Sequence, residues 1–189
     1  MSLIPFGFWA ASGGGGGGAY DLLETTTLAT SASSVTFSGL GSYSDYAHLQ
    51  IRGVVRGDTA GGFYGAQIQF NGDTGTNYVA HRLSGTGSSV TSTALTPRNS
   101  LFAVDHGGST TTSNSFGVGI TDILDFSNTS KNTTTRTLTG QVDNLATRIN
   151  LYSGVWLDTS AITSISIKAQ GSSDFVAGSR FSLFGIKGA

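Results

Sequence analysis

The stretch Tyr46-Ala-His-Leu-Gln-Ile-Arg-Gly-Val-Val55 decides the fold. Its apolar positions recur at every second residue, and mostly polar side chains fill the positions between them. Because successive side chains of a strand point to opposite faces, this period predicts a β-strand with one face in a core. One face carries Leu49, Ile51, Gly53 and Val55, and the other carries His48, Gln50 and Arg52.

The same alternation returns in residues 65–70, where Ala66, Ile68 and Phe70 alternate with glutamines. The following Asn71-Gly-Asp-Thr-Gly75 is a dense turn signal. Residues 78–83 resume the strand pattern. Together these segments predict two strands joined by a turn.

Further β-prone stretches follow, separated by residues rich in glycine, serine and threonine. No stretch has the periodicity of a convincing helix. About ten strands with turns between them are typical of a two-sheet sandwich. Residues 133–139 are polar and β-branched, which suits an exposed or edge strand. The other predicted strands are residues 34–37, 101–104, 116–126, 149–157, 162–167 and 181–186.

The composition argues against several classes of function. Charged residues make up only 11% of the chain and the net charge is −1, so we expect no basic patch and no nucleic-acid partner. There is no cysteine, so the fold uses neither disulfides nor thiolate metal sites. No apolar run reaches the roughly 18–20 residues of a membrane helix, and the first residues lack the positive charge of a secretory signal. We therefore expect neither a membrane-spanning nor an exported protein.

The first 18 residues differ from the rest of the chain. An apolar stretch with large aromatic side chains precedes six consecutive glycines, which have nothing to bury and much backbone entropy to lose. We expect residues 1–18 to be an extended docking arm with a flexible linker of roughly 13–15 Å, and residues 19–189 to be the β-sandwich domain. An arm folded back onto its own domain, or a frayed terminus, is the alternative. The expected docking residues are Ile4, Phe6, Phe8 and Trp9, and the linker residues are Gly13, Gly14, Gly15, Gly16, Gly17 and Gly18.

Candidate chemical groups are few and scattered. Asn71-Gly72-Asp73 resembles the start of a calcium loop, but the further acids of such a loop are missing, which favours a plain turn. Asp122 and Asp125 are three apart, so a strand would place them on opposite faces, and a polysaccharide hydrolase needs two placed carboxylates. We expect no catalytic residue, no metal site and no cofactor. The three histidines lack metal-ligand spacing and are expected to make ordinary hydrogen bonds; they are His48, His81 and His106.

Several segments between Val35 and Gly188 share a pattern with a known family. In combination they resemble the small virion structural proteins of tailed bacteriophages, especially marine ones. The resemblance implies a particle component without established catalytic residues, and it does not cover the arm. The segments are His48-Leu-Gln-Ile-Arg52, Gln69-Phe-Asn-Gly-Asp-Thr-Gly75, Tyr78, His81-Arg-Leu83, Leu151-Tyr-Ser-Gly-Val-Trp156, Thr163-Ser-Ile165 and Phe181-Ser-Leu-Phe-Gly-Ile-Lys-Gly188.

We therefore expect an all-β, jelly-roll or concanavalin-like two-sheet β-sandwich with an N-terminal extended arm. Its expected role is that of a non-enzymatic virion protein, made in the host cytoplasm: a capsid decoration or cement protein, anchored by the arm in a capsid or tail subunit. Low surface charge favours a homo-oligomer, and particle symmetry favours a trimer. The alternative is a tail-fibre or receptor-binding module that takes a host glycan. Aromatic residues available for a sugar-binding face are Tyr43, Tyr46, Tyr64, Tyr78, Tyr152 and Trp156. The competing interpretation is that most of them belong to the core or its rim.

Overall fold

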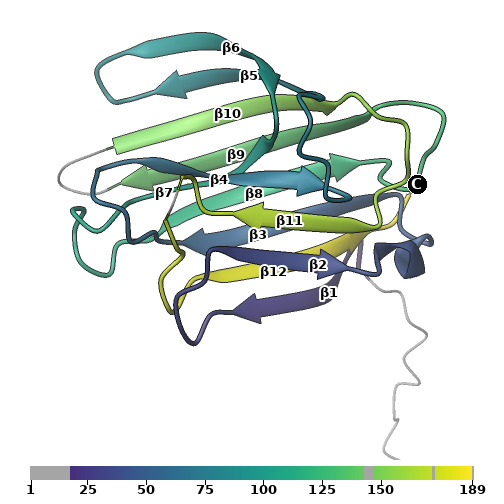
Figure 1. The fold of residues 1–189 in the computed structure, drawn as a ribbon, viewed down its shortest axis with the longest axis horizontal. Coiled ribbons are helices and arrows are strands. Elements are labelled where there is room, and N and C mark those ends of the chain that lie inside the picture. Colours follow the sequence, from purple (N-terminus) through teal and green to yellow (C-terminus); the bar gives the residue numbers. More distant parts are fainter. Residues whose placement is uncertain (1–17, 143–146, 172, 189) are drawn as a thin grey trace, which may run out of the picture.

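The computed structural model describes residues 18–142, 147–171 and 173–188. In this part of the chain, twelve strands form two antiparallel sheets that face each other (Figure 1). The expectation of an all-β two-sheet sandwich is confirmed. The docking residues of the predicted arm (Ile4, Phe6, Phe8 and Trp9) and the linker residues from Gly13 to Gly17 lie outside the described residues.

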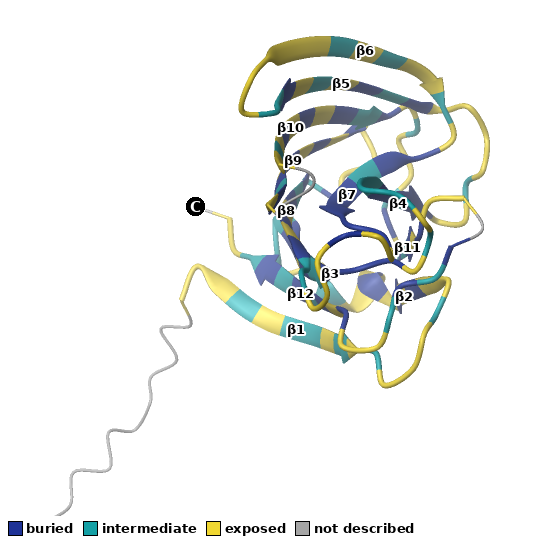
Figure 2. Cartoon of the chain, turned by 90° about the vertical axis from the view of Figure 1, so that its left-hand side faces the viewer, coloured by how far each residue is buried: buried dark blue, intermediate teal, exposed yellow. Residues whose placement is uncertain are grey.

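The larger sheet has eight strands and curves around the smaller one (Figure 2). Many of its neighbouring strands are far apart in sequence, so the sheet forms only when distant segments meet. Two of its strands, β1 and β6, were not predicted from the sequence. The order across the sheet is β1 (Tyr20–Thr27), β12 (Arg180–Ile186), β3 (His48–Val55), β8 (Gly117–Leu124), β9 (Thr133–Val142), β10 (Thr147–Trp156), β5 (Tyr78–Gly85) and β6 (Val90–Arg98).

The smaller sheet has four strands and covers part of the larger one. The helical structure in the described residues is a single 3-10 turn, Leu40–Tyr43, which follows the first strand of this sheet. Accordingly, the described part of the chain contains no helix with the length and apolarity to span a bilayer. The strand order is β2 (Ser34–Ser38), β11 (Ser164–Lys168), β4 (Tyr64–Phe70) and β7 (Leu101–His106).

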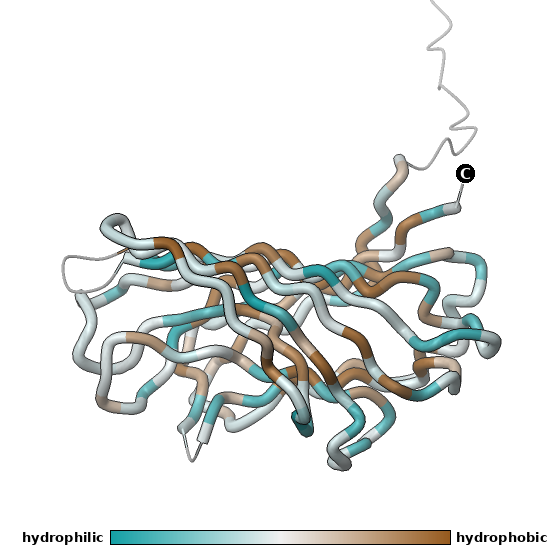
Figure 3. The backbone as a smooth tube through the Cα atoms, turned by 90° about the horizontal axis from the view of Figure 1, so that it is seen from above, coloured by the Kyte–Doolittle hydropathy of each residue, from teal (hydrophilic) through white to brown (hydrophobic). Residues whose placement is uncertain are grey.

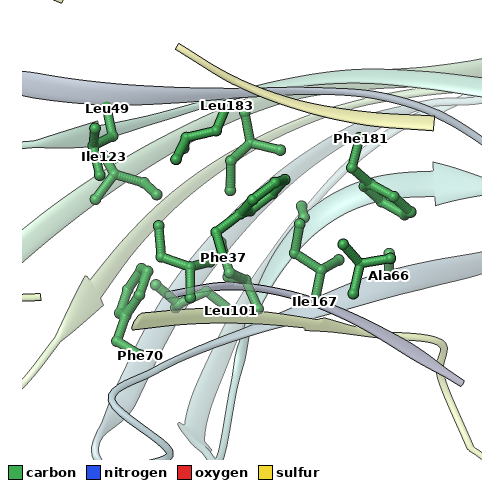
Figure 4. Close-up of a cluster of buried hydrophobic side chains, with 14 of the residues drawn as sticks. Phe37, Leu49, Ala66, Phe70, Leu101, Ile123, Ile167, Phe181 and Leu183 are labelled. Atoms are coloured by element: carbon green, nitrogen blue, oxygen red, sulfur yellow. The ribbon is translucent and has the colours of Figure 1, made fainter. Parts of the chain in front are cut away.

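The apolar core lies between β12, β3 and β8 of the larger sheet and the four strands of the smaller one. Side chains from both layers interdigitate there (Figure 4). The decisive stretch behaves as its alternation predicts, because Leu49, Ile51 and Val55 of β3 are fully buried. Each such side chain contributes roughly 1.5–3 kcal/mol on leaving water. Facing them across the core are Phe37, Ile68, Phe70, Ile165 and Ile167.

Strand β9 contradicts the expectation of an exposed or edge strand for residues 133–139. It pairs on both sides, with β8 and with β10, and so lies inside the larger sheet. Four of its five threonines lie on the inner face and are buried although they are polar, and Thr134 is exposed on the other face. The buried members are Thr133, Thr135, Thr137 and Thr139.

Two of these threonines, Thr137 and Thr139, together with Thr121 of β8, form hydrogen bonds to the free edge of β7. Strand β7 is the last strand of the smaller sheet, so the backbone groups on its outer edge have no strand partner. A buried backbone group without a partner is costly, and here hydroxyl groups of the facing sheet take the place of a neighbouring strand. Three hydrogen bonds do so: Thr137 Oγ1 donates to Phe102 O (2.9 Å), Thr121 Oγ1 donates to Ala103 O (3.0 Å), and Asp105 N donates to Thr139 Oγ1 (2.7 Å).

Two glycines allow β7 to approach the larger sheet this closely. Gly53 of β3 and Gly119 of β8 are register partners beneath it. A Cβ on Gly53 would lie 2.4 Å from a methyl carbon of Val104, and one on Gly119 would lie 2.9 Å from Ala103 O. Neither distance is tolerable, so a side chain at either position would lift β7 away from the threonine hydroxyls.

We predict that Thr137→Val destabilises the fold by about 1–3 kcal/mol, because valine keeps the shape but leaves Phe102 O buried without its donor. Urea unfolding measures the change. Thr134→Val is the matched control on the same strand, since Thr134 is exposed; it should change stability by less than about 0.5 kcal/mol. Equal losses in the two variants would contradict the role assigned to Thr137.

Candidate functional site

A cleft of about 250 Å³ lies between one end of the larger sheet and the smaller sheet. Strands β5, β6 and β10 form one wall, and β4 and β7 form the other. The cleft combines three arginines, four aromatic rings and one carboxyl group, a concentration of chemistry that we find nowhere else in the described chain. Its lining residues include Phe63, Tyr64, Arg82, Arg98, Phe102, Asp105, Arg148 and Tyr152.

Asp105 is the carboxyl group at the floor of the cleft and is almost fully buried. Asn150 Nδ2 donates to its Oδ2 (2.6 Å), and Tyr152 OH donates to its Oδ1 (3.2 Å). Burial raises the pKa of Asp105 to about 6, although these hydrogen bonds and the nearby arginines act in the opposite direction. Burial, and then the charge of Asp105, raises the pKa of Tyr152. The phenol therefore stays protonated and acts as a donor.

The arginines of the cleft rest on aromatic rings. The Arg98 guanidinium lies 4.5 Å from the centroid of the Phe102 ring, and its Nε donates to Ser100 O (3.2 Å). The Arg148 guanidinium lies 4.0 Å from the centroid of Phe63. Stacking of this kind holds a guanidinium plane in place while its N–H groups remain available at the edge.

The three histidines lie apart from one another and belong to separate structural contacts. His48 Nδ1 accepts from the backbone N of Asp125 (2.9 Å), His81 is exposed on β5, and His106 is fully buried. Burial lowers the pKa of His106, and its Nδ1 lies 3.0 Å from Gly107 O. In the described residues, no three acidic or histidine side chains are grouped to hold a metal ion.

The Asn71-Gly72-Asp73 stretch is a turn, as the sequence favours. Both oxygens of the Asp73 carboxylate are occupied: Oδ2 accepts from Trp156 Nε1 (2.7 Å) and from Asn77 Nδ2 (3.0 Å), and Oδ1 accepts from Gly75 N (2.8 Å). The hydrogen bonds from Trp156 and Asn77 lower the pKa of Asp73. The carboxylate therefore fastens the turn to the core.

The acidic pair considered for catalysis does not form a pair. Asp122 lies on β8 and forms an ion pair with Arg136 (3.0 Å). Asp125 follows the strand and forms an ion pair with Lys131. Each carboxylate thus has a cationic partner of its own. Asp105 is the one carboxyl group among the described residues that line the cleft.

Two of the six aromatic residues proposed for a sugar-binding face line the cleft, namely Tyr64 and Tyr152. Tyr78 and Trp156 are buried in the core instead. Tyr43 and Tyr46 pack partly buried against the core. Four of the six thus belong to the core or pack against it, as the competing interpretation expects, and a sugar-binding role for Tyr64 and Tyr152 stays a prediction.

A second surface stands out on the outer face of the larger sheet. Four aliphatic side chains occupy one cross-strand row over β8, β9, β10 and β5, and each is between 42% and 52% exposed. We call these residues and those of the next row the aliphatic face. The first row is Ile120, Leu138, Leu151 and Leu83, and the second is Val118, Gly140, Ile149, Gly85 and Val90.

The aliphatic face is apolar and also contains a hollow. Gly140 lies between Val118 and Ile149 in the second row, and its missing side chain opens a hollow of about 440 Å³. Hydrophobic residues, brown on the backbone tube, alternate with hydrophilic ones along many of the strands (Figure 3). Arg52 and Arg180 border the hollow on the β3 and β12 side.

No protein-family model, no curated protein and no solved structure matches this chain. The chemistry of both surfaces must therefore be argued from their own residues. The cleft offers charge and stacking for a ligand, with one carboxyl group whose pKa is near neutral. The aliphatic face offers apolar area for a protein partner.

Sequence reasoning did not single out the residues that make the cleft. Arg82, Arg98, Asp105 and Arg148 come from four different strands, and only the sheet order brings them together. One local signal was present in β10, where Arg148, Asn150 and Tyr152 alternate with aliphatic residues. This alternation predicts a strand with one polar and one aliphatic face. It does not by itself indicate which of the two faces points into the protein.

We predict that Asp105 gives the protein an unusual pH dependence. Its pKa in the folded state, about 6, exceeds the ordinary value of 3.8. The folded protein therefore binds this proton more readily than the unfolded chain, and the stability that Asp105 contributes falls as the pH rises from about 4 to about 6. On acidification from pH 7 to pH 4, the wild type should gain about 2 kcal/mol relative to Asp105→Asn.

Urea unfolding of both proteins at pH 4 to 8 measures this difference. Asp21, Asp73 and Asp125, whose pKa values are lowered, are common to both and cancel. Asp45→Asn, an exposed position outside the cleft, serves as the control. Parallel stability curves for the wild type and Asp105→Asn would contradict the buried, proton-binding carboxyl group.

Proposed function

We propose that this protein is a structural component of a tailed-phage particle, a non-enzymatic sandwich module that acts by assembly. The observation that carries the proposal is the aliphatic face, with its exposed row of Ile120, Leu138, Leu151 and Leu83. Contiguous exposed apolar patches of this kind are rare on soluble monomeric proteins, and they mark surfaces that contact a partner. The family resemblance supports placing that contact in a virion.

The occupant of the aliphatic face is a second copy of this chain. A ridge, the first row, runs beside a hollow at Gly140 on the same surface. An interface in which each copy presents the same patch to the other seats the ridge of one in the hollow of its partner. The net charge of −1 also leaves little repulsion between copies. Such a contact closes a dimer, and the trimer expected from particle symmetry would need a further, head-to-tail contact between copies.

The proposal extends to the type of sandwich, which we infer to be jelly-roll or concanavalin-like. The support is the interleaved strand order. The neighbours β12 and β3, and likewise β10 and β5, are far apart in sequence, as in sandwiches built from long crossing connections.

The predicted arm provides the anchor in a capsid or tail subunit. Its apolar residues Ile4, Phe6, Phe8 and Trp9 precede a linker that ends at the exposed Gly18, next to the edge strand β1. Burial of such side chains stabilises a complex by roughly 1.5–3 kcal/mol each, before the entropy of association is deducted. The module then sits on the particle surface as a decoration or cement protein.

The second candidate is a tail-fibre or receptor-binding module that takes a host glycan. The specific observation in its favour is the cleft, where the partly exposed rings of Phe63 and Tyr64 lie beside arginines. Adsorption of the isolated protein to host cells would favour this candidate over a cement protein.

We predict that the double variant Leu138→Glu/Leu151→Lys is monomeric, whereas the wild type is oligomeric. The two residues are register partners, so the introduced opposite charges face each other and leave the sheet paired. Size-exclusion chromatography with light scattering measures the oligomeric state.

The matched control is Thr134→Glu/Val155→Lys, the register pair on the same two strands outside the aliphatic face. It should remain oligomeric. A monomeric wild type, or an oligomer that survives Leu138→Glu/Leu151→Lys, would exclude the aliphatic face as the contact between copies.

We also predict that deletion of residues 1–18 abolishes binding to purified particles without lowering the melting temperature of the sandwich. The physical reason is that the deletion removes the apolar anchors and no residue of the described core. Occupancy on the particles is measured by quantitative gel analysis. Full occupancy of the arm-deleted protein would show that the arm is not the anchor.

A further inference from the structure

The cleft carries more positive charge than its surroundings neutralise. Arg82, Arg98 and Arg148 face a single carboxyl group, Asp105. The ion pairs of lysine and arginine found in the described residues involve Lys131, Arg136 and Lys187, and so none of the three arginines. Because the whole chain has a net charge of −1, this excess is a local feature and not a general property of the surface.

Asp105 is already committed to other partners and does not balance the arginines. Its two oxygens accept from Asn150 and Tyr152 on the adjoining strand β10. At the same time, Arg82 Nε is buried and has no hydrogen-bond partner among the described residues. A buried donor without an acceptor is unfavourable, and an anion that enters the cleft would relieve it.

The arginines are held in advance of binding. Arg98 and Arg148 rest on the rings of Phe102 and Phe63, so little side-chain entropy remains to be lost when a ligand arrives. Gly65 keeps the floor open, since a Cβ there would lie 2.9 Å from the Phe102 ring and 3.1 Å from Asp105 Oδ1. A planar guanidinium held by its face presents two parallel N–H groups, the geometry that matches a carboxylate.

The rest of the lining suits a sugar ring. Phe63 and Tyr64 are partly exposed, and Gln170, exposed at the rim, offers an amide. The Phe102 ring is already occupied, because Arg98 lies over it and Tyr152 stacks on it. Apolar faces with a few placed polar groups are the usual composition of small-molecule sites. The volume of about 250 Å³ lies just below the roughly 300–1,000 Å³ of drug-sized sites, which favours one monosaccharide unit of a longer chain.

We propose that this cleft binds an acidic saccharide, with Arg82, Arg98 and Arg148 around the sugar carboxylate and the rings of Phe63 and Tyr64 against the sugar ring. This deepens the receptor-binding candidate of the proposed function. Its failure would leave the particle assignment intact, because that assignment is tested separately by assembly and by the arm. A single-stranded nucleic acid, which also combines negative charge with rings that stack, is the competing ligand. The low overall charge of the chain disfavours it.

The test uses full-length protein and isothermal titration calorimetry. The probe is trigalacturonic acid, and the comparison ligand is its methyl ester, which keeps the hydroxyl groups and rings but removes the charge. We expect the acid to bind at least tenfold more tightly than the ester. Equal binding of the two, or no binding of the acid at millimolar concentration, would overturn the proposal.

The matched variants are Arg98→Gln and Arg148→Gln in the cleft, and Arg136→Gln on the outer face, where the side chain forms an ion pair with Asp122. We expect the two cleft variants to lose at least tenfold in affinity for the acid and Arg136→Gln to keep it. The same loss in all three, or tighter binding of an oligothymidylate than of the acid, would overturn the proposal. If a cleft variant fails to fold, the comparison of acid and ester in the wild type still decides.

Discussion

The hydrogen bonds between the hydroxyl groups of one sheet and the free edge of β7 are the interaction on which this sandwich depends. An edge strand buried against another sheet must find donors and acceptors, or it loses the free energy gained by burial. Thr121, Thr137 and Thr139 meet that demand, and the glycines beneath β7 allow the approach. A valine at any of the three positions would fill the same space and leave a backbone group unpaired.

The consequence of this arrangement is a reversal of the usual polarity over part of the larger sheet. In β9 and β10 the inner face carries threonine, asparagine and tyrosine, and the aliphatic residues lie outside. The polar inner face supplies the wall of the cleft and the partners of Asp105. The outward aliphatic residues, Leu138 and Leu151 among them, supply the surface assigned to assembly. The cleft proposed to bind a ligand and the aliphatic face proposed for assembly thus both arise because β9 and β10 turn their polar faces inward.

The sequence predicts the positions of most strands. It predicts which face of a strand is buried correctly in some strands and not in others. The alternation in β3 identifies both the strand and its buried face, because the apolar positions there meet an apolar layer. In β9 the same rule fails: threonines indicate an exposed edge, yet the demand for partners comes from β7, about 35 residues earlier in the chain. No pattern within the sequence of β9 indicates that β7 needs hydrogen-bond partners. Arg56 is a similar case, since its buried guanidinium donates to Thr112 O (2.7 Å) and Ser115 O (3.0 Å), contacts that only the folded loop creates.

The backbone amide of Asp105 allows the most direct test, because its N–H donates to the side-chain hydroxyl of Thr139 and not to the backbone carbonyl of a neighbouring strand. Native-state hydrogen exchange, followed by NMR, measures its protection in the wild type and in Thr139→Val. The account predicts that this amide is protected as strongly as core strand amides in the wild type and exchanges much faster in the variant, while the amides of β3 are unchanged. Rapid exchange in the wild type, or equal protection in the two proteins, would show that the threonine hydroxyls do not close the edge of β7.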